Sequence, residues 1–492
     1  MNLIFASDEI DLSKPIKEDS TLTDLDFDPI LDSMADGNRN IREICKMIFE
    51  NINTDRSTVE LRQTIVMDAM SNLEKFQQMA KIASDTVKVI KEHIFWMHSG
   101  KPSIEIFESR MILSTFLDAL PKIMQLLGSI RNGKCSEIFK KYVDEFINTF
   151  NEKWLNGARE IISVSDFSNF LAASVSLDWD LSFRDISLFK SGKKRLIGFG
   201  TKTRKWTLPQ TCESCGEELE SFRDAITGEV ASILRIIVSF VHRKMLQMSR
   251  EFSFYVGCVN FINRMNNLGI SLTFPNIIDG KLPEIEFTDL VEASLALRSG
   301  KRPVPNSLER PGAITFIVTG PNSGGKTVFL RSVGQAQILA QSGLPVPATM
   351  YRSTIFNHVF AYFSKYEKFE DQKGRFEKEL LDLQEIVSNL TCKDLVILDE
   401  PLASTNQYDG AMIMKEVIRS FENGLIVTLI STHFYHLVLW TRESKNYRRV
   451  LMTAERLSDG QRTFKIKQAP DAQGSSWAAD VWERIIADDR VN

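Results

Sequence analysis

Apolar residues recur at steps of three and four along the first half of the chain, which predicts helices. The pattern holds from Asp24 to about Leu127, where Thr54-Asp55-Arg56 interrupts it and offers a cap for the next helix. A second helical tract is expected from about Lys134 to Val164, and a third, free of proline, from Cys215 to Asn267. One face of the third tract carries a continuous apolar stripe, which is equally consistent with a helix in a core bundle and with a long arm. Its residues are Ile226, Val230, Ile233, Leu234, Ile237, Val241, Met245 and Met248.

The segment between the second and third tracts, about 166–210, is irregular, with strands expected at 188–189 and 195–199. Residues 190–206 contain no acid and seven basic side chains, namely Lys190, Lys193, Lys194, Arg195, Lys202, Arg204 and Lys205. We interpret them as a basic hairpin at the tip of two arms. Charge runs of this kind are commonly solvated surface, and contact with nucleic acid is the functional alternative.

After Pro275 the pattern changes from helical to β-rich. Residues 272–297 are expected to form strands and loops. From Gly312 onward, apolar β-branched runs alternate with helical segments, which predicts a parallel α/β sheet. Its first buried strand is expected at 313–319, and a helix from Val328 to about Ser342.

The turn between that strand and that helix matches the pattern G-x-x-x-x-G-K-[ST]. Its residues are Gly320, Pro321, Asn322, Ser323, Gly324, Gly325, Lys326 and Thr327. Glycines let backbone N–H groups surround phosphates, and the N-terminus of the following helix adds a positive dipole end. The pattern predicts that Lys326 contacts the β- and γ-phosphates of ATP and that Thr327 ligates Mg²⁺.

Two further strands are expected to end beside this loop. Residues 394–398 form a buried run that leads to Asp399 and Glu400, and such acids face the crevice at the carboxyl ends of parallel strands. We assign Asp399 to Mg²⁺ and Glu400 to orienting or deprotonating the attacking water. A third strand, 425–430, leads to Ser431-Thr432-His433, where a polar side chain can sense the γ-phosphate, although a lone histidine is commonly structural.

Composition sets limits on the class of protein. The chain has 492 residues, 43% hydrophobic and 25% charged, with a net charge of -4, so bulk charge does not indicate nucleic acid. The N-terminus lacks the long apolar region of a secretory signal, and there is no apolar run of about 18 residues, the length of a membrane span. The six cysteines do not suggest a disulfide scaffold, and the Cys212-x-x-Cys215 pair lacks the second half of a zinc ribbon. We therefore expect a cytoplasmic protein without a membrane partner.

Taken together, these motifs resemble the MutS mismatch-repair family, within the ABC-type ATPases. GPNSGGKT looks like that family's P-loop, and LVILDEPLASTNQYDG at 395–410 resembles its Asp-Glu stretch with the loop that follows. Ser431-Thr432-His433-Phe434 is similar to its Ala-Thr-His-Tyr. Val-Pro-Asn at 304–306 and Val-Pro-Ala at 346–348 also match, and residues 54–63 are similar to the start of the family's helical core.

The resemblance implies a homodimer in which each P-loop faces the partner's signature loop and its Ser404–Gln407 loop. The trans-interface candidates are Arg375, Ser404, Thr405 and Asn406. The signature loop, here 374–379, has lost its hydroxyls, so Arg375 is a candidate for contact with the partner's γ-phosphate. Pro303 stands where an aromatic commonly stacks on adenine. The family's mismatch-reading domain with its Phe-x-Glu wedge has no counterpart in the sequence, so a short MutS-like protein is expected.

We therefore predict a C-terminal α/β ABC-type P-loop ATPase domain joined to an all-α core and lever domain with a small clamp-like tip. The expected segments are an arm at 1–20, a helical core at 21–130, lever helices at 131–270 with the clamp-like segment at about 166–210, and the ATPase domain at 271–492. The expected function is ATP- and Mg²⁺-dependent binding of mismatched, branched or distorted DNA in repair or recombination, with Glu400 and His433 catalytic. The DNA-binding candidates are Lys193, Lys194, Arg195, Lys202, Arg204 and Lys205.

The sequence supports three alternative functions less well. A chromosome-maintenance ATPase with long coiled coils is disfavoured because neither helical tract sustains heptads. A P-loop kinase of small molecules lacks an evident substrate pocket. An ATP-binding structural or regulatory dimer that does not act on DNA stays open, because the signature hydroxyls are missing.

Overall fold

The chain forms two compact units in a computed structural model, and each is described by itself. The first unit contains residues 71–253 together with 1–2, and the second contains residues 3–70 and 254–492. The residues that the structure describes are 2–4, 20–52, 55–97, 101–163, 170–177, 183–190, 215–280, 282–364, 374–444, 446–457 and 461–469.

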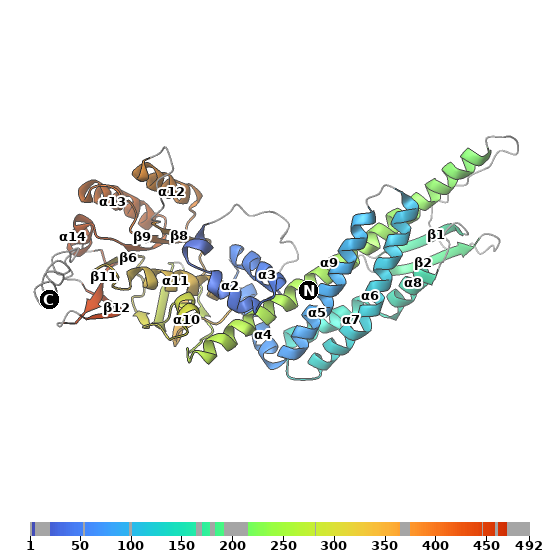
Figure 1. The fold of residues 1–492 in the computed structure, drawn as a ribbon, viewed down its shortest axis with the longest axis horizontal. Coiled ribbons are helices and arrows are strands. Elements are labelled where there is room, and N and C mark those ends of the chain that lie inside the picture. Colours follow the sequence, from blue (N-terminus) through green and yellow to red (C-terminus); the bar gives the residue numbers. More distant parts are fainter. Residues whose placement is uncertain are drawn as a thin grey trace, which may run out of the picture. The chain divides into compact units, whose positions relative to one another are not determined.

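The first unit is a helical bundle with a β-hairpin (Figure 1). Its elements are α5 (Leu73–Met97), α6 (Pro102–Arg131), α7 (Glu137–Thr149), α8 (Glu152–Ser163), β1 (Phe170–Leu177), β2 (Phe183–Lys190) and the first part of α9 (Cys215–Asn267). Helix α9 has the bounds of the predicted proline-free tract, which confirms that prediction. Five of the stripe side chains are buried, namely Leu234, Ile237, Val241, Met245 and Met248, whereas Val230 and Ile233 are half-buried.

The tract from Lys134 to Val164 was expected as one helix, and that expectation is wrong. Helices α7 and α8 replace it, with a break at Phe150. The side chain of Asn151 accepts a hydrogen bond from the backbone N–H of Trp154 at 3.0 Å, so it starts a new helix. Phe150 turns into the bundle, where its ring lies 4.9 Å from that of Phe116 and 5.0 Å from that of Trp154. Burial of these aromatic rings favours the break over a continuous helix.

Among the described helices, α6 alone has the length and composition to cross a membrane. Core helices of soluble proteins pass the same test, and α6 packs against α5, α7 and α8. We therefore interpret it as a bundle helix.

The second unit contains a six-stranded sheet, a four-stranded sheet and the helices that cover them (Figure 1). Its helices before the sheets are α1 (Thr21–Asp24), α2 (Asp28–Ala35), α3 (Arg39–Glu50), α4 (Arg56–Ser71) and the end of α9. The four-stranded sheet has the order β3-β7-β4-β5, from β3 (Asn276–Ile277), β7 (Met350–Ser353), β4 (Ile285–Leu290) and β5 (Asn306–Leu308), and the short helix α10 (Ala293–Ser299) follows β4.

The six-stranded sheet has the order β12-β11-β6-β10-β9-β8. Its strands are β6 (Thr315–Thr319), β8 (Val359–Phe363), β9 (Leu395–Asp399), β10 (Val427–Ser431), β11 (Arg449–Arg456) and β12 (Arg462–Gln468). The five strands from β11 to β8 are parallel, as predicted, whereas β12 returns antiparallel to β11. Strands β6 and β10 are buried along their full length, so the core of this unit lies at the centre of the sheet.

Helices cover both faces of this sheet. Helix α11 (Lys326–Gln341) packs on β8, β9 and β10 and is buried along most of its length. Helices α12 (Arg375–Asn389), α13 (Gln407–Asn423) and α14 (Tyr435–Glu443) pack with the sheet into a second apolar cluster that includes Ile317, Leu398 and Ile430. This arrangement gives an α/β layer structure, with α11 running directly from the glycine-rich loop into the core.

Gly343, just after α11, lies against α4 with no room for a side chain. Its φ of 81° is in the left-handed region, and a Cβ there would lie 2.4 Å from the Cβ of Arg62. Arg62 is fully buried, and its Nε donates to the backbone oxygen of Ile4 at 2.7 Å. The end of α11, the middle of α4 and the N-terminal residues are therefore packed in direct contact.

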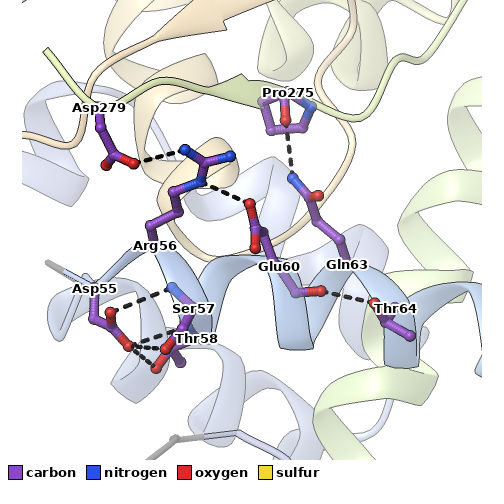
Figure 2. A network of polar contacts seen from close by, with 9 residues as sticks. All are labelled: Asp55, Arg56, Ser57, Thr58, Glu60, Gln63, Thr64, Pro275 and Asp279. Carbon is purple, nitrogen blue, oxygen red and sulfur yellow. Dashed lines mark hydrogen bonds and ion pairs between the residues drawn. The ribbon is translucent and has the colours of Figure 1, made fainter. Parts of the chain in front are cut away.

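The cap predicted in Thr54-Asp55-Arg56 is provided by Asp55, which precedes α4, as Figure 2 shows. The Asp55 carboxylate accepts from the backbone N–H groups of Ser57 at 3.2 Å and Thr58 at 3.1 Å, and from both hydroxyls at 2.7 and 2.8 Å. The hydrogen bond from the Ser57 hydroxyl is the largest cause that holds the pKa of Asp55 below its usual value. Asp55 therefore satisfies N–H groups that the first helical turn leaves without a partner.

Two contacts tie the first turns of α4 to the segment around β3 (Figure 2). Arg56 donates to Asp279 and to Glu60, both at 2.7 Å. Gln63 donates to the backbone oxygen of Pro275 at 3.0 Å. Arg56 and Asp279 are solvent-exposed, so this ion pair orients the segment and contributes little to stability.

Replacing Asp55 with alanine is expected to destabilise the second unit by about 1 kcal/mol at neutral pH, the usual contribution of an N-cap. A carboxyl whose pKa is lowered by folding stabilises the fold above its unfolded pKa, about 3.9 for aspartate, and that contribution is lost as the pH falls through the folded pKa. The difference in the free energy of unfolding between variant and wild type should therefore disappear at acid pH. Urea unfolding at neutral and at acid pH measures this difference.

Asp279→Ala is the matched control, since it removes one exposed partner from the same network. Its effect should stay below about 0.5 kcal/mol. Equal destabilisation by the two variants would contradict the capping role of Asp55.

Candidate functional site

Three neighbouring strands bring the candidate residues to one edge of the six-stranded sheet. Strand β10 lies between β6 and β9, and Ser431 at its end is in register with Val318 and Asp399. The loop that follows β6 and the acids that follow β9 therefore flank the end of β10. The loop at 320–327 and the acids at 399–400 thus lie together, as expected from the sequence.

The glycine-rich loop adopts a conformation that side chains would obstruct. Gly320 and Gly325 have φ of 122° and 95°, in the left-handed range. A Cβ on Gly324 would lie 2.8 Å from the Cβ of Ala454, and one on Gly325 would lie 3.2 Å from the backbone oxygen of Phe464. The β11–β12 hairpin thus closes against the loop. Helix α11 begins at Lys326, two residues earlier than expected, so its free N–H groups belong to the loop itself.

Thr327 and Asp399 meet across the loop. The Thr327 hydroxyl donates to Asp399 Oδ2 at 2.7 Å, and the Ser431 hydroxyl donates to Asp399 Oδ1. Burial raises the pKa of Asp399, and these two hydrogen bonds act in the opposite direction. Two hard oxygen donors in contact are the kind of ligand that Mg²⁺ prefers.

Lys326 is buried, with only 5% of its surface exposed. Its Nζ lies 3.0 Å from the backbone oxygen of Gly320 and 3.3 Å from that of Pro321, and 3.7 Å from Glu400 Oε1. Burial lowers the pKa of Lys326, and the charges of Glu400 and Asp399 oppose that change. The ammonium group is therefore held at the mouth of the loop by its own carbonyls and one carboxylate.

His433 joins Lys326 and Glu400 into a triad of charged or titratable groups. His433 Nε2 lies 2.8 Å from Glu400 Oε1 and 3.1 Å from Lys326 Nζ. The hydrogen bond with His433 is the largest cause that lowers the pKa of Glu400, so Glu400 is a carboxylate near neutral pH. A carboxylate requires a donor, so Nε2 carries a proton towards Glu400, while the lysine donates to the loop carbonyls.

The trans-interface candidates lie at the start of α12 and in the loop before α13. Arg375 Nε lies 3.3 Å from Glu379 Oε1, and the buried Glu379 accepts from the Ser404 hydroxyl at 2.8 Å. Glu379 thus links Arg375 with Ser404. Asn406 is the N-cap of α13, and Thr405 precedes it.

Several predicted residues fall outside the described part of the chain. They are the six DNA-binding candidates Lys193, Lys194, Arg195, Lys202, Arg204 and Lys205, together with the strand expected at 195–199 and Cys212. Cys215 is the first residue of α9. Within the described ranges, no group of three or more His, Cys, Asp or Glu side chains is placed to hold a metal ion.

Two features of the site were missed by reasoning from sequence. Ser431 was considered only as a γ-phosphate sensor, whereas its hydroxyl contacts Asp399 and the backbone of Glu400. The closure of the β11–β12 hairpin on the loop gave no sequence signal, because the glycines match the loop motif with or without it. Asn306 on β5 helps to hold the hairpin in place, since its side chain accepts from the N–H of Ile466 on β12 at 2.7 Å.

Two protein-family models match the chain, one in its N-terminal half and one in its C-terminal part. The family model of MutS domain V matches residues 316–489, and that of the MutS2 N-terminal domain matches residues 54–268. The chain belongs to the MutS family. The resemblance of the sequence motifs to MutS proteins is thereby confirmed.

Two relatives match over most of the chain at low identity, and a third matches a shorter part at higher identity. The DNA mismatch repair protein MutS of Clostridium beijerinckii is 24% identical, covering 87% of this chain and 50% of the relative. The DNA mismatch repair protein MSH3 of Eremothecium gossypii is 23% identical, covering 84% and 40%. The endonuclease MutS2 of Streptococcus thermophilus is 34% identical over 146 residues, 29% of this chain and 19% of the relative. The chain thus spans half or less of the length of these relatives.

Proposed function

We propose that this MutS-family chain is a Mg²⁺-dependent ATPase whose site is formed by Gly320–Thr327, Asp399, Glu400 and His433. The observation that carries the proposal is the contact of Thr327 with Asp399, together with the grouping of Lys326, Glu400 and His433 beside the glycine-rich loop. Hydrolysis of a triphosphate requires N–H donors and a cation for the phosphates, and a carboxylate near the γ-phosphate. The segments that follow three neighbouring strands supply these groups.

The side chains fit a magnesium ion. Thr327 Oγ1 and Asp399 Oδ2 lie 2.7 Å apart and are both oxygen ligands, so they would hold the ion. When bound, Mg²⁺ neutralises charge on the β- and γ-phosphates. The loop fits the phosphates themselves, because its glycines leave the space that a Cβ would fill.

The chain's own residues divide the work of hydrolysis. Lys326 neutralises negative charge on the phosphate oxygens. To do so, its ammonium group leaves the Gly320 and Pro321 carbonyls and contacts the phosphate oxygens. Glu400, kept ionised by His433, orients the attacking water and accepts its proton. His433 holds the Glu400 carboxylate through Nε2 at 2.8 Å.

Homodimerisation is part of the proposal. The resemblance implies that each P-loop faces a partner's α12 start and 404–407 loop. The Arg375–Glu379–Ser404 link supports this, because it ties a cation to the loop that would face the partner. Nucleotide-dependent closure of two such heads follows, since γ-phosphate recruits donors across an interface and hydrolysis removes them.

The proposed partner is DNA, either mismatched, branched or otherwise distorted, recognised through its shape and phosphates. The relatives named as mismatch repair proteins support this partner. A gel shift with linear, mismatched and four-way DNA, with and without ATP, tests it. ATP-dependent retention of distorted DNA is expected. ATP hydrolysis without binding to any of these DNAs would favour the alternative of a regulatory ATP-binding dimer.

Reversing the charges of Lys193, Lys194, Arg195 and Lys205 to glutamate is expected to weaken DNA binding, most strongly at low salt. Each phosphate contact that is lost should flatten the logarithmic salt slope by about 0.9. Fluorescence anisotropy at several salt concentrations measures both quantities.

A variant with the same change in net charge is the control. It carries glutamate at the exposed Lys81, Lys88, Lys122 and Lys141 of the helical bundle. The basic hairpin is not the DNA contact if the two variants lose the same affinity and show the same salt slope.

A further inference from the structure

We propose that Ser431 is a positioning residue that fixes Asp399 and Glu400 relative to each other through its hydroxyl group. This inference deepens the proposed ATPase function and rests on it. Ser431 is the last residue of β10 and is fully buried. Its position between β6 and β9 places it directly beside both acids.

The hydroxyl of Ser431 connects the two acidic residues in one chain of hydrogen bonds. It donates its single proton to Asp399 Oδ1. Its oxygen accepts from the backbone N–H of Glu400 at 3.1 Å. Since a hydroxyl has one proton to give, donation to Asp399 leaves its lone pairs for the Glu400 N–H, and the two bonds fix its orientation.

Glu400 needs this support because its backbone is in an unfavourable conformation. Its φ of 51° lies in the left-handed region, which is strained for a residue with a side chain. The Glu400 N–H is shared between the Ser431 hydroxyl and the Ser431 backbone oxygen, the latter at 3.2 Å. Removing the hydroxyl would leave one long bond to hold the turn that aims Glu400 at His433.

Asp399 depends on the same hydroxyl. Its carboxylate accepts from Thr327 through Oδ2 and from Ser431 through Oδ1. Thr327 is itself a proposed ligand of Mg²⁺, so its hydroxyl would contact both Asp399 and the ion. Ser431 is then the donor that holds the Asp399 carboxylate in one orientation before and after the ion binds.

Because Ser431 lies in a regular strand, the backbone at this position is compatible with alanine, and Ser431→Ala removes one oxygen. The loss of a buried hydroxyl from another site provides a comparison for nonspecific effects. Ser332→Ala serves this purpose, because Ser332 on α11 is buried and donates only to the backbone oxygen of Phe329, at 2.7 Å.

Two readouts test the proposal on the full chain. The first is the binding of a fluorescent ADP analogue, titrated with Mg²⁺ and also measured in EDTA. The second is the steady-state ATP turnover as a function of Mg²⁺ concentration. For Ser431→Ala we expect the half-saturating Mg²⁺ concentration to rise about tenfold in both measurements. This fold-change corresponds to about 1.4 kcal/mol, near the lower end for a hydrogen bond to a charged group. Binding in EDTA should stay unchanged, and Ser431→Thr, which keeps a hydroxyl, should restore most of the loss.

Each outcome decides between the two proposals. An unchanged Mg²⁺ dependence in Ser431→Ala, an equal shift in Ser332→Ala, or no recovery in Ser431→Thr would each overturn the role of Ser431 while the ATPase proposal stands. If the unmodified protein neither binds the analogue nor hydrolyses ATP, the ATPase proposal itself fails and takes this inference with it. A tenfold shift confined to Ser431→Ala supports both.

Discussion

Replacing Lys326 with alanine is expected to reduce ATP turnover by about 100- to 1,000-fold, the scale seen when a preorganised donor is removed from an active site. Lys326 is the buried cation at the mouth of the loop, and its Nζ is held by the Gly320 and Pro321 carbonyls. A water molecule that fills the space left by the shorter side chain carries no charge, so it cannot replace the ammonium group. Release of phosphate under steady-state conditions measures the loss, and binding of a fluorescent ATP analogue shows whether affinity falls with it.

The comparison for Lys326 is Lys301→Ala, which removes an exposed lysine from the same unit. Its turnover should match that of the wild type. Circular dichroism should show that Lys326→Ala is folded, because the substitution also leaves Glu400 without a nearby cation. Unaltered turnover in folded Lys326→Ala would refute the nucleotide site at this loop.

Changing Glu400 to glutamine is expected to separate ATP binding from hydrolysis. Glutamine keeps the size of the side chain and an oxygen that can accept from His433 Nε2, but it cannot take a proton from water. Turnover should fall by about 100- to 10,000-fold, the contribution typical of a positioned general base. ATP affinity should stay within a few-fold of the wild type, because the loop, Lys326 and Thr327 are untouched.

A single-turnover measurement with bound radiolabelled ATP is the most direct test for Glu400, since it excludes effects on product release. Glu416→Gln, at an exposed position on α13, is the matched control and should hydrolyse ATP normally. Wild-type turnover by Glu400→Gln would assign the proton transfer to another group, and a loss of ATP affinity would make Glu400 a binding residue.

Much of the site could be predicted from sequence because its parts follow strands of high apolar content. The runs at 313–319, 394–398 and 425–430 form β6, β9 and β10. Parallel strands end on the same edge, so the motifs after them had to come close once their strands were neighbours. The proline-free tract gave α9 for a similar reason, since nothing in it interrupts a helix.

The parts that could not be predicted depend on contacts between segments far apart in the chain. The break between α7 and α8 results from Asn151 and from rings that meet only when the bundle is folded. The hydroxyl of Ser431 finds Asp399 because β10 inserts between β6 and β9, and strand order is not written in the local pattern. The left-handed turn at Glu400 is likewise invisible in sequence, because glutamate has no particular preference for it.

The close packing at Gly343 has a consequence for how the nucleotide loop communicates with the rest of its unit. Since a methyl group added at Gly343 would collide with Arg62, the C-terminal end of α11 is tightly packed against α4. We therefore expect a displacement of α11 to displace α4. Through the hydrogen bond of Arg62, it should also displace the backbone at Ile4. Amide hydrogen exchange in the middle of α4 should then report on whether ATP occupies a loop more than two hundred residues away in the sequence.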